Sequence, residues 1–356
     1  MRRWLEDLLL AAWCHKGLVS TLLLPFSWIY GLISQHHLAG QAQRAWRAPV
    51  PVVVIGNILL GGTGKTPVAQ AVCQTLLAQG WKPGLISRGY GTRIGPKPHL
   101  SDGGGSASHL GDEPALLHAA TGVPVAVHPN RSLAARHLLH THPEVDVLIA
   151  DDGLQHRALA RDVEIAVQDG RGIGNGRLLP AGPLREPPGR LSNVQWIVTQ
   201  LGSNEVQRTP TQQAGTAPMV ALRLVPKQCR QLANGGHTLT WSQWRAQFPA
   251  TECGAVAGIG HPERFFSMLR TQGVKLVQTL ALPDHGTLNA THLNGFAASP
   301  ILITAKDAVK CAHLDDARLW VVEVAAQFDD PSWLITLGAQ LRRLQDRRTH
   351  KPGDRH

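Results

Sequence analysis

The chain has 356 residues, of which 43% are hydrophobic and 17% charged, so a disordered or fibrous protein is excluded and two domains with separate cores are possible. The net charge of +10 favours an anionic partner, but the few aromatic residues do not alternate with basic ones as a base-stacking surface requires, so nucleic acid is not an expected partner. Five dispersed cysteines without a C-x-x-C pair indicate a reducing compartment and no zinc site.

The first 47 residues differ from the rest of the chain. Arg2 and Arg3 precede an uncharged, largely apolar run from Gly17 to Ser34, which Pro25 interrupts. The run is close to the lower limit of the ~17–25 residues that cross a bilayer, and a proline near its middle breaks a helix. We therefore expect residues 1–47 to form a helical segment that lies in a membrane interface, with aromatic and basic residues near the headgroups. A cleaved signal peptide and a buried core helix remain the alternatives.

A glycine-rich loop lies between a strand expected at Val52–Ile55 and a helix expected at Pro67–Gln79. The loop reads Gly61-Gly62-Thr63-Gly64-Lys65-Thr66, and such glycines let successive backbone N–H groups face one anion. The lysine places a charge at the outer phosphates and the following hydroxyl suits Mg²⁺. Leu59 stands where the strict phosphate-loop pattern has its first glycine, so an ordinary glycine turn is the alternative. The segment predicts a nucleoside triphosphate site.

Apolar strands alternate with helical stretches from Val50 onward, which predicts a P-loop-like, doubly wound α/β sheet at 48–217 and a smaller α/β domain at 218–345. A polar linker is expected at Gly202–Ala217, and a basic tail at 346–356. The other expected strands are Pro83–Ser87, Val123–Val127, Val145–Ala150, Val163–Val167, Val194–Thr199, Ala255–Ile259, Val274–Leu280, Ile301–Thr304 and Leu319–Val324. Helices are expected after Pro262, near His292, after Asp307 and from Pro331.

Two pairs of acids are candidates for phosphate chemistry. Asp151 and Asp152 end an apolar strand that a P-loop sheet places beside the phosphates, and carboxylates suit Mg²⁺, although acids that cap a turn are the alternative. Asp112 and Glu113 open a helical stretch, and local sequence alone favours Asp112 as a helix cap.

Two arginines are further candidates. Arg88 follows a strand, and Arg185 lies in a proline-rich loop that would hold its side chain in a fixed direction. Each is expected to reach phosphate or to be an ordinary surface charge.

The chain resembles the tetraacyldisaccharide 4'-kinase family over nearly its whole length. The chain differs from the family pattern at His261, Gly286 and Ala305. The resemblance depends on ordered motifs at Gly61–Pro67, Ser87–Gly91, Gly111–Glu113, Asp151–His156, Asp169–Pro187, Ala257–Phe266 and Pro283–His285.

The resemblance implies a kinase that transfers the γ-phosphoryl group of ATP to the 4'-hydroxyl of a tetraacylated glucosamine disaccharide 1-phosphate, in lipid A biosynthesis. It implies that Asp112 activates the hydroxyl with His285 as its partner, in a site between the two domains. Mg²⁺ would be organised by Thr66 and Asp151, with support from Asp152 and Glu113. It places the enzyme at the cytoplasmic face of the bacterial inner membrane, peripheral or monotopic, with no obligate protein partner.

The resemblance changes the local interpretations of Asp112 and His285, and it assigns a role to the two arginines. Asp112 would be a base and not a cap, and His285 a catalytic residue where local sequence reads a loop histidine. Arg88 or Arg185 would offset charge on the transferring group.

Two other classes of protein match the sequence less well than a kinase does. A regulatory P-loop NTPase that recognises guanine requires an [NT]-K-x-D signature, and Thr304–Asp307 has its lysine one position late. Leu60 stands where related dimerising ATPases carry a signature lysine. A membrane adaptor without chemistry has no need for Asp112, Asp151 and Asp152.

Overall fold

The computed structural model describes residues 13–103, 105–203, 205, 217–233, 236–284, 286–311 and 313–349. The strands are β1 (Val52–Gly56), β2 (Pro83–Ser87), β3 (His99–Leu100), β4 (Val125–Val127), β5 (Val147–Asp151), β6 (Val163–Asp169), β7 (Trp196–Leu201), β8 (Met219–Gln231), β9 (Thr238–Thr240), β10 (Glu252–Ala257), β11 (Lys275–Ala281), β12 (Ile301–Thr304) and β13 (Leu319–Phe328). The helices are α2 (Leu18–Leu22), α3 (Leu24–Gln43), α4 (Lys65–Ala78), α5 (Ala107–Leu110), α6 (Asp112–Thr121), α7 (Arg131–Thr141), α8 (Trp241–Gln247), α9 (Pro262–Thr271), α10 (Ala290–Asn294), α11 (Ala305–Lys310) and α12 (Ser332–Thr349), with 3₁₀ turns at Ser101–Gly103 and Pro188–Asn193.

The strands form one continuous mixed sheet in the order β11-β10-β12-β13-β8-β7-β6-β1-β5-β2-β4-β3, with β9 paired to β8. Neighbouring strands are parallel except where β3 meets β4 and where β8 meets β9 and β13. All ten strands expected from the sequence are present; β2 and β12 have the expected ends, and the ends of the others are shifted. The expected helices are present as α4, α9, α10, α11 and α12. The helix expected after Asp307 begins earlier, at Ala305, because Thr304 caps it by accepting a hydrogen bond from the Asp307 N–H.

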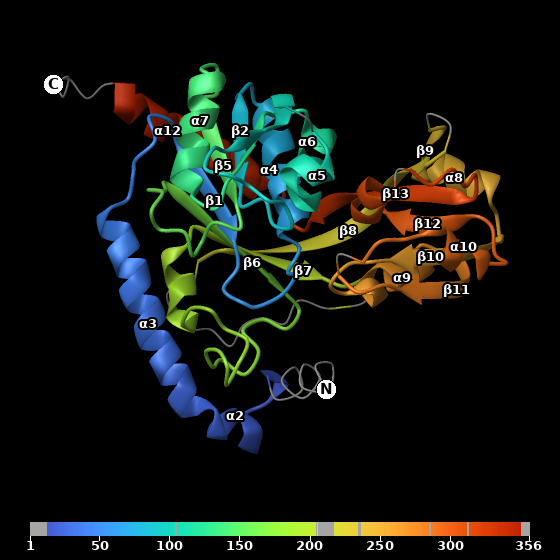
Figure 1. Cartoon of the computed structure of the whole chain (residues 1–356), viewed down its shortest axis with the longest axis horizontal. Helices are drawn as coiled ribbons and strands as arrows, with labels where there is room; N and C mark the ends of the chain where they lie inside the picture. Colours follow the sequence, from blue (N-terminus) through green and yellow to red (C-terminus); the bar gives the residue numbers. More distant parts are fainter. Residues whose placement is uncertain are drawn as a thin grey trace.

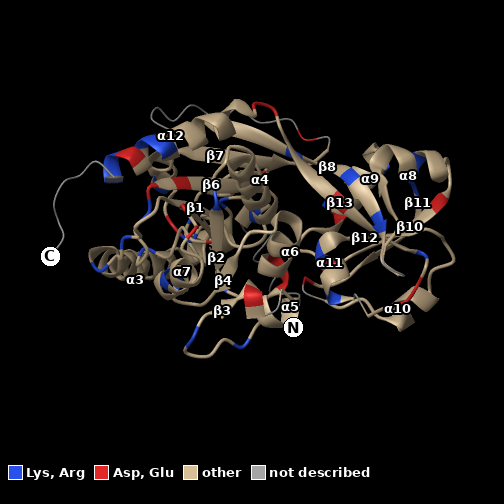
Figure 2. Cartoon of the chain, turned by 90° about the horizontal axis from the view of Figure 1, so that it is seen from above, with Lys and Arg blue, Asp and Glu red and all other residues tan. Residues whose placement is uncertain are grey.

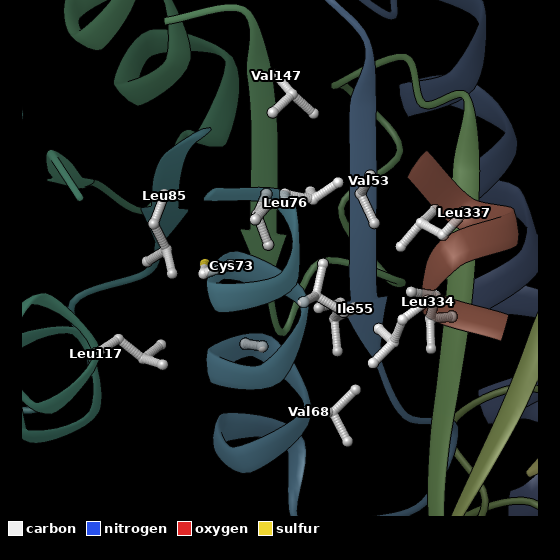
Figure 3. Close-up of a cluster of buried hydrophobic side chains, with 14 of the residues drawn as sticks. Val53, Ile55, Val68, Cys73, Leu76, Leu85, Leu117, Val147, Leu334 and Leu337 are labelled. Atoms are coloured by element: carbon white, nitrogen blue, oxygen red, sulfur yellow. The ribbon is translucent and has the colours of Figure 1, made fainter. Parts of the chain in front are cut away.

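The strands β7, β6, β1, β5, β2, β4 and β3 form what we call the β1 half of the sheet, and β11, β10, β12 and β13 form the smaller half. Helices cover both faces of the β1 half, as a doubly wound fold requires (Figure 1). One core lies between the strands and helices α4, α6 and α12, where Val53 and Ile55 of β1 meet Val68 and Leu76 of α4 (Figure 3). The other core receives the alternate strand residues and is covered by α7. Alternation along β1 therefore fills two cores from one short strand.

The long strand β8, which the sequence analysis did not predict, joins the two halves of the sheet. Its first residues pair in parallel with β7, and the stretch from Leu222 to Gln231 pairs antiparallel with β13. The pairing shifts register between Glu323 and Val324, opposite Pro226, which has no N–H to give to the ladder. Most of the expected linker at Gly202–Ala217 lies outside the described residues.

Helix α12 differs from the expectation in length and in place. It continues to Thr349, past the position at which a basic tail was expected, and Arg348 binds Asp162 at 2.7 Å. Trp333, Leu334 and Leu337 pack into the core that α4 covers and not onto the smaller half. Figure 3 shows Leu334 and Leu337 in this core. Strand β13 runs antiparallel along β8, so it brings the chain back to the β1 half before α12 begins.

Helix α3 runs along one side of the β1 half (Figure 1). Its inward face is small and polar: Ser27 donates to the Leu178 carbonyl at 2.8 Å and accepts from the Ala181 N–H at 3.0 Å. A Cβ at Gly31 would lie 2.9 Å from a Leu178 methyl, so glycine permits this close contact. Pro25 occupies the first turn of α3, where its missing N–H costs nothing, and α2 ends just before it.

No helix in the described part of the chain combines the length and the apolar character that a bilayer crossing requires. Residues 1–12, including Arg2 and Arg3, lie outside the described part.

Candidate active site

The glycine loop ends at the first residue of α4. Gly61 and Gly64 have φ angles of 101° and 84°, a region that side chains other than glycine rarely adopt. A Cβ on Gly64 would also lie 1.6 Å from Gln200 Oε1. Lys65 begins the helix, so the N–H groups of the first turn, which have no partner within the helix, are directed toward the loop. This geometry is suited to binding an anion.

Lys65 faces the two acids at the end of β5. Its Nζ lies 3.4 Å from Asp152 Oδ1, and an Arg185 guanidinium nitrogen lies 3.9 Å from the same oxygen. Burial alone would raise the pKa of Asp152, but Lys65, Arg185 and Arg131 together hold it below its usual range. Asp152 is therefore a carboxylate that lies close to two cations beside the glycine loop.

Asp151 has a different environment. Its side chain is 1% exposed, and within the described residues neither carboxylate oxygen has a hydrogen-bond partner. Burial, followed by the charge of Glu113, raises the pKa of Asp151 to about 7. An unpartnered buried carboxylate is costly, and a hard cation with oxygen ligands relieves that cost.

A divalent cation fits this donor set only in part. Among the described residues, no three His, Cys, Asp or Glu side chains are grouped closely enough to hold a metal ion by themselves. Mg²⁺ usually takes one or two protein carboxylates and completes its shell with phosphate and water. Asp151 therefore suits a cation that arrives with a phosphate group, and not a metal held by the protein alone.

In the absence of nucleotide and metal, replacing Asp151 by Asn should stabilise the folded protein by an amount that depends on pH. The folded carboxyl keeps its proton up to about pH 7, whereas the unfolded carboxyl releases it near about pH 4, so the native protein loses stability as the pH rises between these values. Asn has no such penalty. The variant's advantage in the free energy of unfolding, measured by urea denaturation, should grow across this window and level off above it. Asp315→Asn, at an exposed loop position, is the control, and a pH-independent difference for Asp151→Asn would contradict the raised pKa.

Residues beneath the loop fix the position of Arg185. Gln155 donates to the Asn57 carbonyl at 2.9 Å and to Glu186 at 2.8 Å, and its amide oxygen accepts from Arg185 at 3.4 Å. Arg157 pairs with Glu186 at 2.9 Å. In the sequence, Gln155 belongs to the Asp151–His156 motif without a predicted role; its position four residues after Asp151 was the available signal.

Asp112 and Glu113 open α6, opposite α11 of the smaller half (Figure 2). Gly111, with φ 94°, takes the cap position, so Asp112 is not the helix cap that local sequence favoured. Asp112 Oδ2 lies 3.4 Å from Lys310 Nζ, and Glu113 Oε1 lies 3.3 Å from Lys306 Nζ. His285, the predicted partner of Asp112, lies outside the described residues.

A second contact joins the halves at Asp169, which ends β6 and is fully buried. Its carboxylate lies 2.9 Å from Arg171 and 3.1 Å from Arg264, which α9 of the smaller half supplies. Burial would raise the pKa of Asp169, but hydrogen bonds from Arg171 and the charge of Arg264 lower it. In the sequence, Asp169 and Arg264 lie within motifs but have no predicted role.

Arg88 is solvent-exposed in the turn after β2. Its charge is among those that affect Arg131, whose pKa burial lowers to about 10 and whose guanidinium donates to the Asp152 carbonyl at 3.2 Å. Arg88 thus acts on this region through its charge on Arg131, while Arg185 lies 3.9 Å from the Asp152 carboxylate.

An anion-binding glycine loop that faces a lysine toward two acids, at the ends of parallel strands, defines an α/β protein of the nucleotide-dependent phosphotransferase class. The chain belongs to the tetraacyldisaccharide-1-P 4'-kinase family, which matches residues 19–342.

Relatives and a solved structure agree with this family. The chain is 49% identical over 347 residues to a tetraacyldisaccharide 4'-kinase of Bordetella parapertussis, with 96% of this chain and 99% of the relative covered. It is 51% identical over 341 residues to one of Bordetella petrii, covering 93% and 94%. The fold is similar to a crystal structure of LpxK from Aquifex aeolicus in complex with ATP, with a TM-score of 0.73, 24% identity and coverage of 92% and 99%.

Proposed function

We infer that this protein is an ATP-dependent kinase that phosphorylates the 4'-hydroxyl of a tetraacylated glucosamine disaccharide 1-phosphate, in lipid A biosynthesis. The family match over residues 19–342 supports this function. The observation that carries it within the chain is the approach of Lys65 to Asp152, next to Asp151, whose carboxylate has no hydrogen-bond partner among the described residues. Phosphoryl transfer requires mainly positioning and charge stabilisation, and this arrangement supplies both.

The nucleotide phosphates would be held by the backbone of the loop and by Lys65. The loop residues assigned to this role are Gly61, Gly62, Thr63, Gly64 and Thr66. Arg185, held by Gln155, and Arg88 would offset charge on the transferring group.

Bound Mg²⁺ would neutralise charge on the phosphates during transfer. Asp151 is the leading residue for holding it, with Thr66 beside the loop and with Asp152 and Glu113 in support. Asp151 suits this role because its carboxylate has no protein partner among the described residues.

Asp112 is the residue assigned to take the proton of the 4'-hydroxyl, with His285 as its partner. A sugar hydroxyl has a pKa far above neutrality, so it needs a positioned proton acceptor in the transition state. Support for this role comes from the place of Asp112 at the start of α6, facing α11 from the other half of the sheet.

We propose a nucleotide-binding domain at 48–217 completed by α12, and a smaller α/β domain that begins at 218 and ends with β13. The smaller domain was expected to extend to residue 345. The packing of α12 into the core that α4 covers favours ending that domain at β13 instead. The reacting groups would then lie between the two domains.

The N-terminal segment is proposed to bind the cytoplasmic face of the inner membrane, where an acylated substrate resides. Ile29 and Ile33 are 57% and 65% exposed on α3, and Phe26 on the same helix and Leu22 at the end of α2 are exposed as well. The inward face of α3 is occupied by the small and polar contacts of Ser27 and Gly31, so the helix is apolar on the side away from the protein. This pattern is typical of an interfacial helix.

Replacing both Ile29 and Ile33 by Glu should weaken binding to anionic phospholipid vesicles by at least about tenfold, because each buried apolar side chain contributes about 1.5–3 kcal/mol. Vesicle co-sedimentation measures the loss, while ATP affinity should stay unchanged. Val277→Glu with Ile335→Glu, at exposed apolar positions elsewhere, is the matched control. Equal vesicle binding by both double variants would exclude α3 as the membrane contact.

The proposed function is tested by incubating the protein with the disaccharide lipid, ATP and Mg²⁺ and analysing the lipid by mass spectrometry. We expect one added phosphate. ATP hydrolysis with no change in the lipid would instead support a regulatory NTPase.

A further inference from the structure

Two lysines of the smaller half face the acids assigned to catalysis. Lys306 and Lys310 are four residues apart on α11, a spacing that places both on one face of a helix. This face lies against the start of α6, and Figure 2 shows the two helices side by side between the halves of the molecule. The contact is therefore a paired one, with two cations from one half and two carboxylates from the other.

The Lys310 ammonium group is the more deeply buried. Its side chain is 8% exposed, and within the described residues its only ion pair is the one at 3.4 Å with Asp112 Oδ2. No described group forms a hydrogen bond with its Nζ, although an ammonium has three donors. Burying a cation is costly unless an anion compensates it, so the position of Lys310 depends on Asp112.

Lys306 supports the neighbouring acid. Its Nζ lies 3.3 Å from Glu113 Oε1 and 3.2 Å from Asp284 Oδ1. The two acids come from different halves, and the position after Asp284 is the predicted catalytic residue His285. Lys306 thus ties the segment that carries His285 to the segment that carries Asp112.

The backbone of α11 is itself fixed. Asp307, between the two lysines, is buried and accepts hydrogen bonds from Thr304 Oγ1 at 2.6 Å and from the Gly258 N–H at 3.1 Å. The lysines are therefore attached to a helix that is anchored to the ends of β12 and β10. A carboxylate held by a rigidly placed ammonium keeps one orientation, which general base catalysis requires.

We propose that Lys310 is a positioning residue for Asp112, and that Lys306 does the same for Glu113. The proposal rests on the function inferred above, with Asp112 as the base. The acids are aligned for proton transfer only while α11 lies against α6, so the smaller half contributes to catalysis through these lysines as well as through His285.

The test is a double-mutant cycle in single-turnover lipid phosphorylation, with lipid and ATP saturating. Lys310→Met should lower the rate constant by about 10–100-fold, the usual cost of removing a group that orients a catalytic side chain. The dissociation constant for ATP should change less than about twofold. In an Asp112→Asn background, Lys310→Met should cause no further loss, because Lys310 acts through the carboxylate that is already missing.

Two controls keep the outcome clear. Lys310→Arg retains the charge and should keep the rate within about threefold of the wild type. Lys275→Met removes an exposed lysine of the same half, paired with Glu252 at 2.7 Å, and should leave the rate unchanged.

Three results would overturn the proposal: an unchanged rate in Lys310→Met, the same fold-loss with and without Asp112, or a loss in Lys310→Arg equal to that in Lys310→Met. A wild-type protein that does not phosphorylate the lipid would instead refute the proposed function.

Discussion

Lys65→Ala is expected to lower kcat/KM for lipid phosphorylation by at least about 10²–10³-fold, the usual cost of removing one preorganised charge-stabilising donor. Lys65 begins α4, and among the described residues it is the cation nearest the Asp152 carboxylate, at 3.4 Å. Without it, the phosphates lose the point charge that accompanies the backbone N–H groups of the loop. Initial rates with varied ATP measure the change.

The control for this variant is Lys97→Ala, at an exposed position between β2 and β3, which should retain full activity. Thermal unfolding without nucleotide separates a folding defect from a catalytic one. Full-rate phosphorylation by Lys65→Ala would remove the glycine loop from the mechanism.

Asp112→Asn should lower kcat by about 10²–10⁴-fold and leave the dissociation constant for ATP nearly unchanged, because an amide cannot accept the hydroxyl proton. Asn keeps the size of the side chain at the start of α6. The loss should therefore appear in single-turnover phosphoryl transfer and not in nucleotide binding, which fluorescence titration measures.

Asp315→Asn, in the exposed loop between α11 and β13, is the matched control and should keep the wild-type kcat. An Asp112→Asn protein with unchanged kcat would show that another group takes the proton.

Local sequence predicted the parts of the fold that depend on periodicity. The apolar runs of β1 and β5 and the glycine loop between β1 and α4 follow from residues adjacent in the chain, so their positions were predicted closely. The placing of Asp151 and Asp152 beside Lys65 also follows, because parallel strands end at the same edge of a sheet.

Contacts between distant residues could not be predicted in this way. The strand β8 contains Pro226 and charged residues, and it is a strand because β7 and β13 pair with it from either side. A helix was expected from Pro331 as part of the smaller domain, yet the apolar face of α12 fills the core that the sheet forms with α4. The proposed role of Lys310 could not be predicted from local sequence, because it depends on the Asp112 carboxylate nearly two hundred residues away.

The measurement that tests the central claim most directly is the fate of the γ-phosphoryl group. The protein is incubated with ATP labelled in that group, Mg²⁺ and the disaccharide lipid, and the position of the label is determined by mass spectrometry and phosphorus–proton correlation. The account predicts labelled phosphate on the 4'-oxygen, and none in Lys65→Ala. Label released only to water, or attached at another oxygen of the disaccharide, would contradict it.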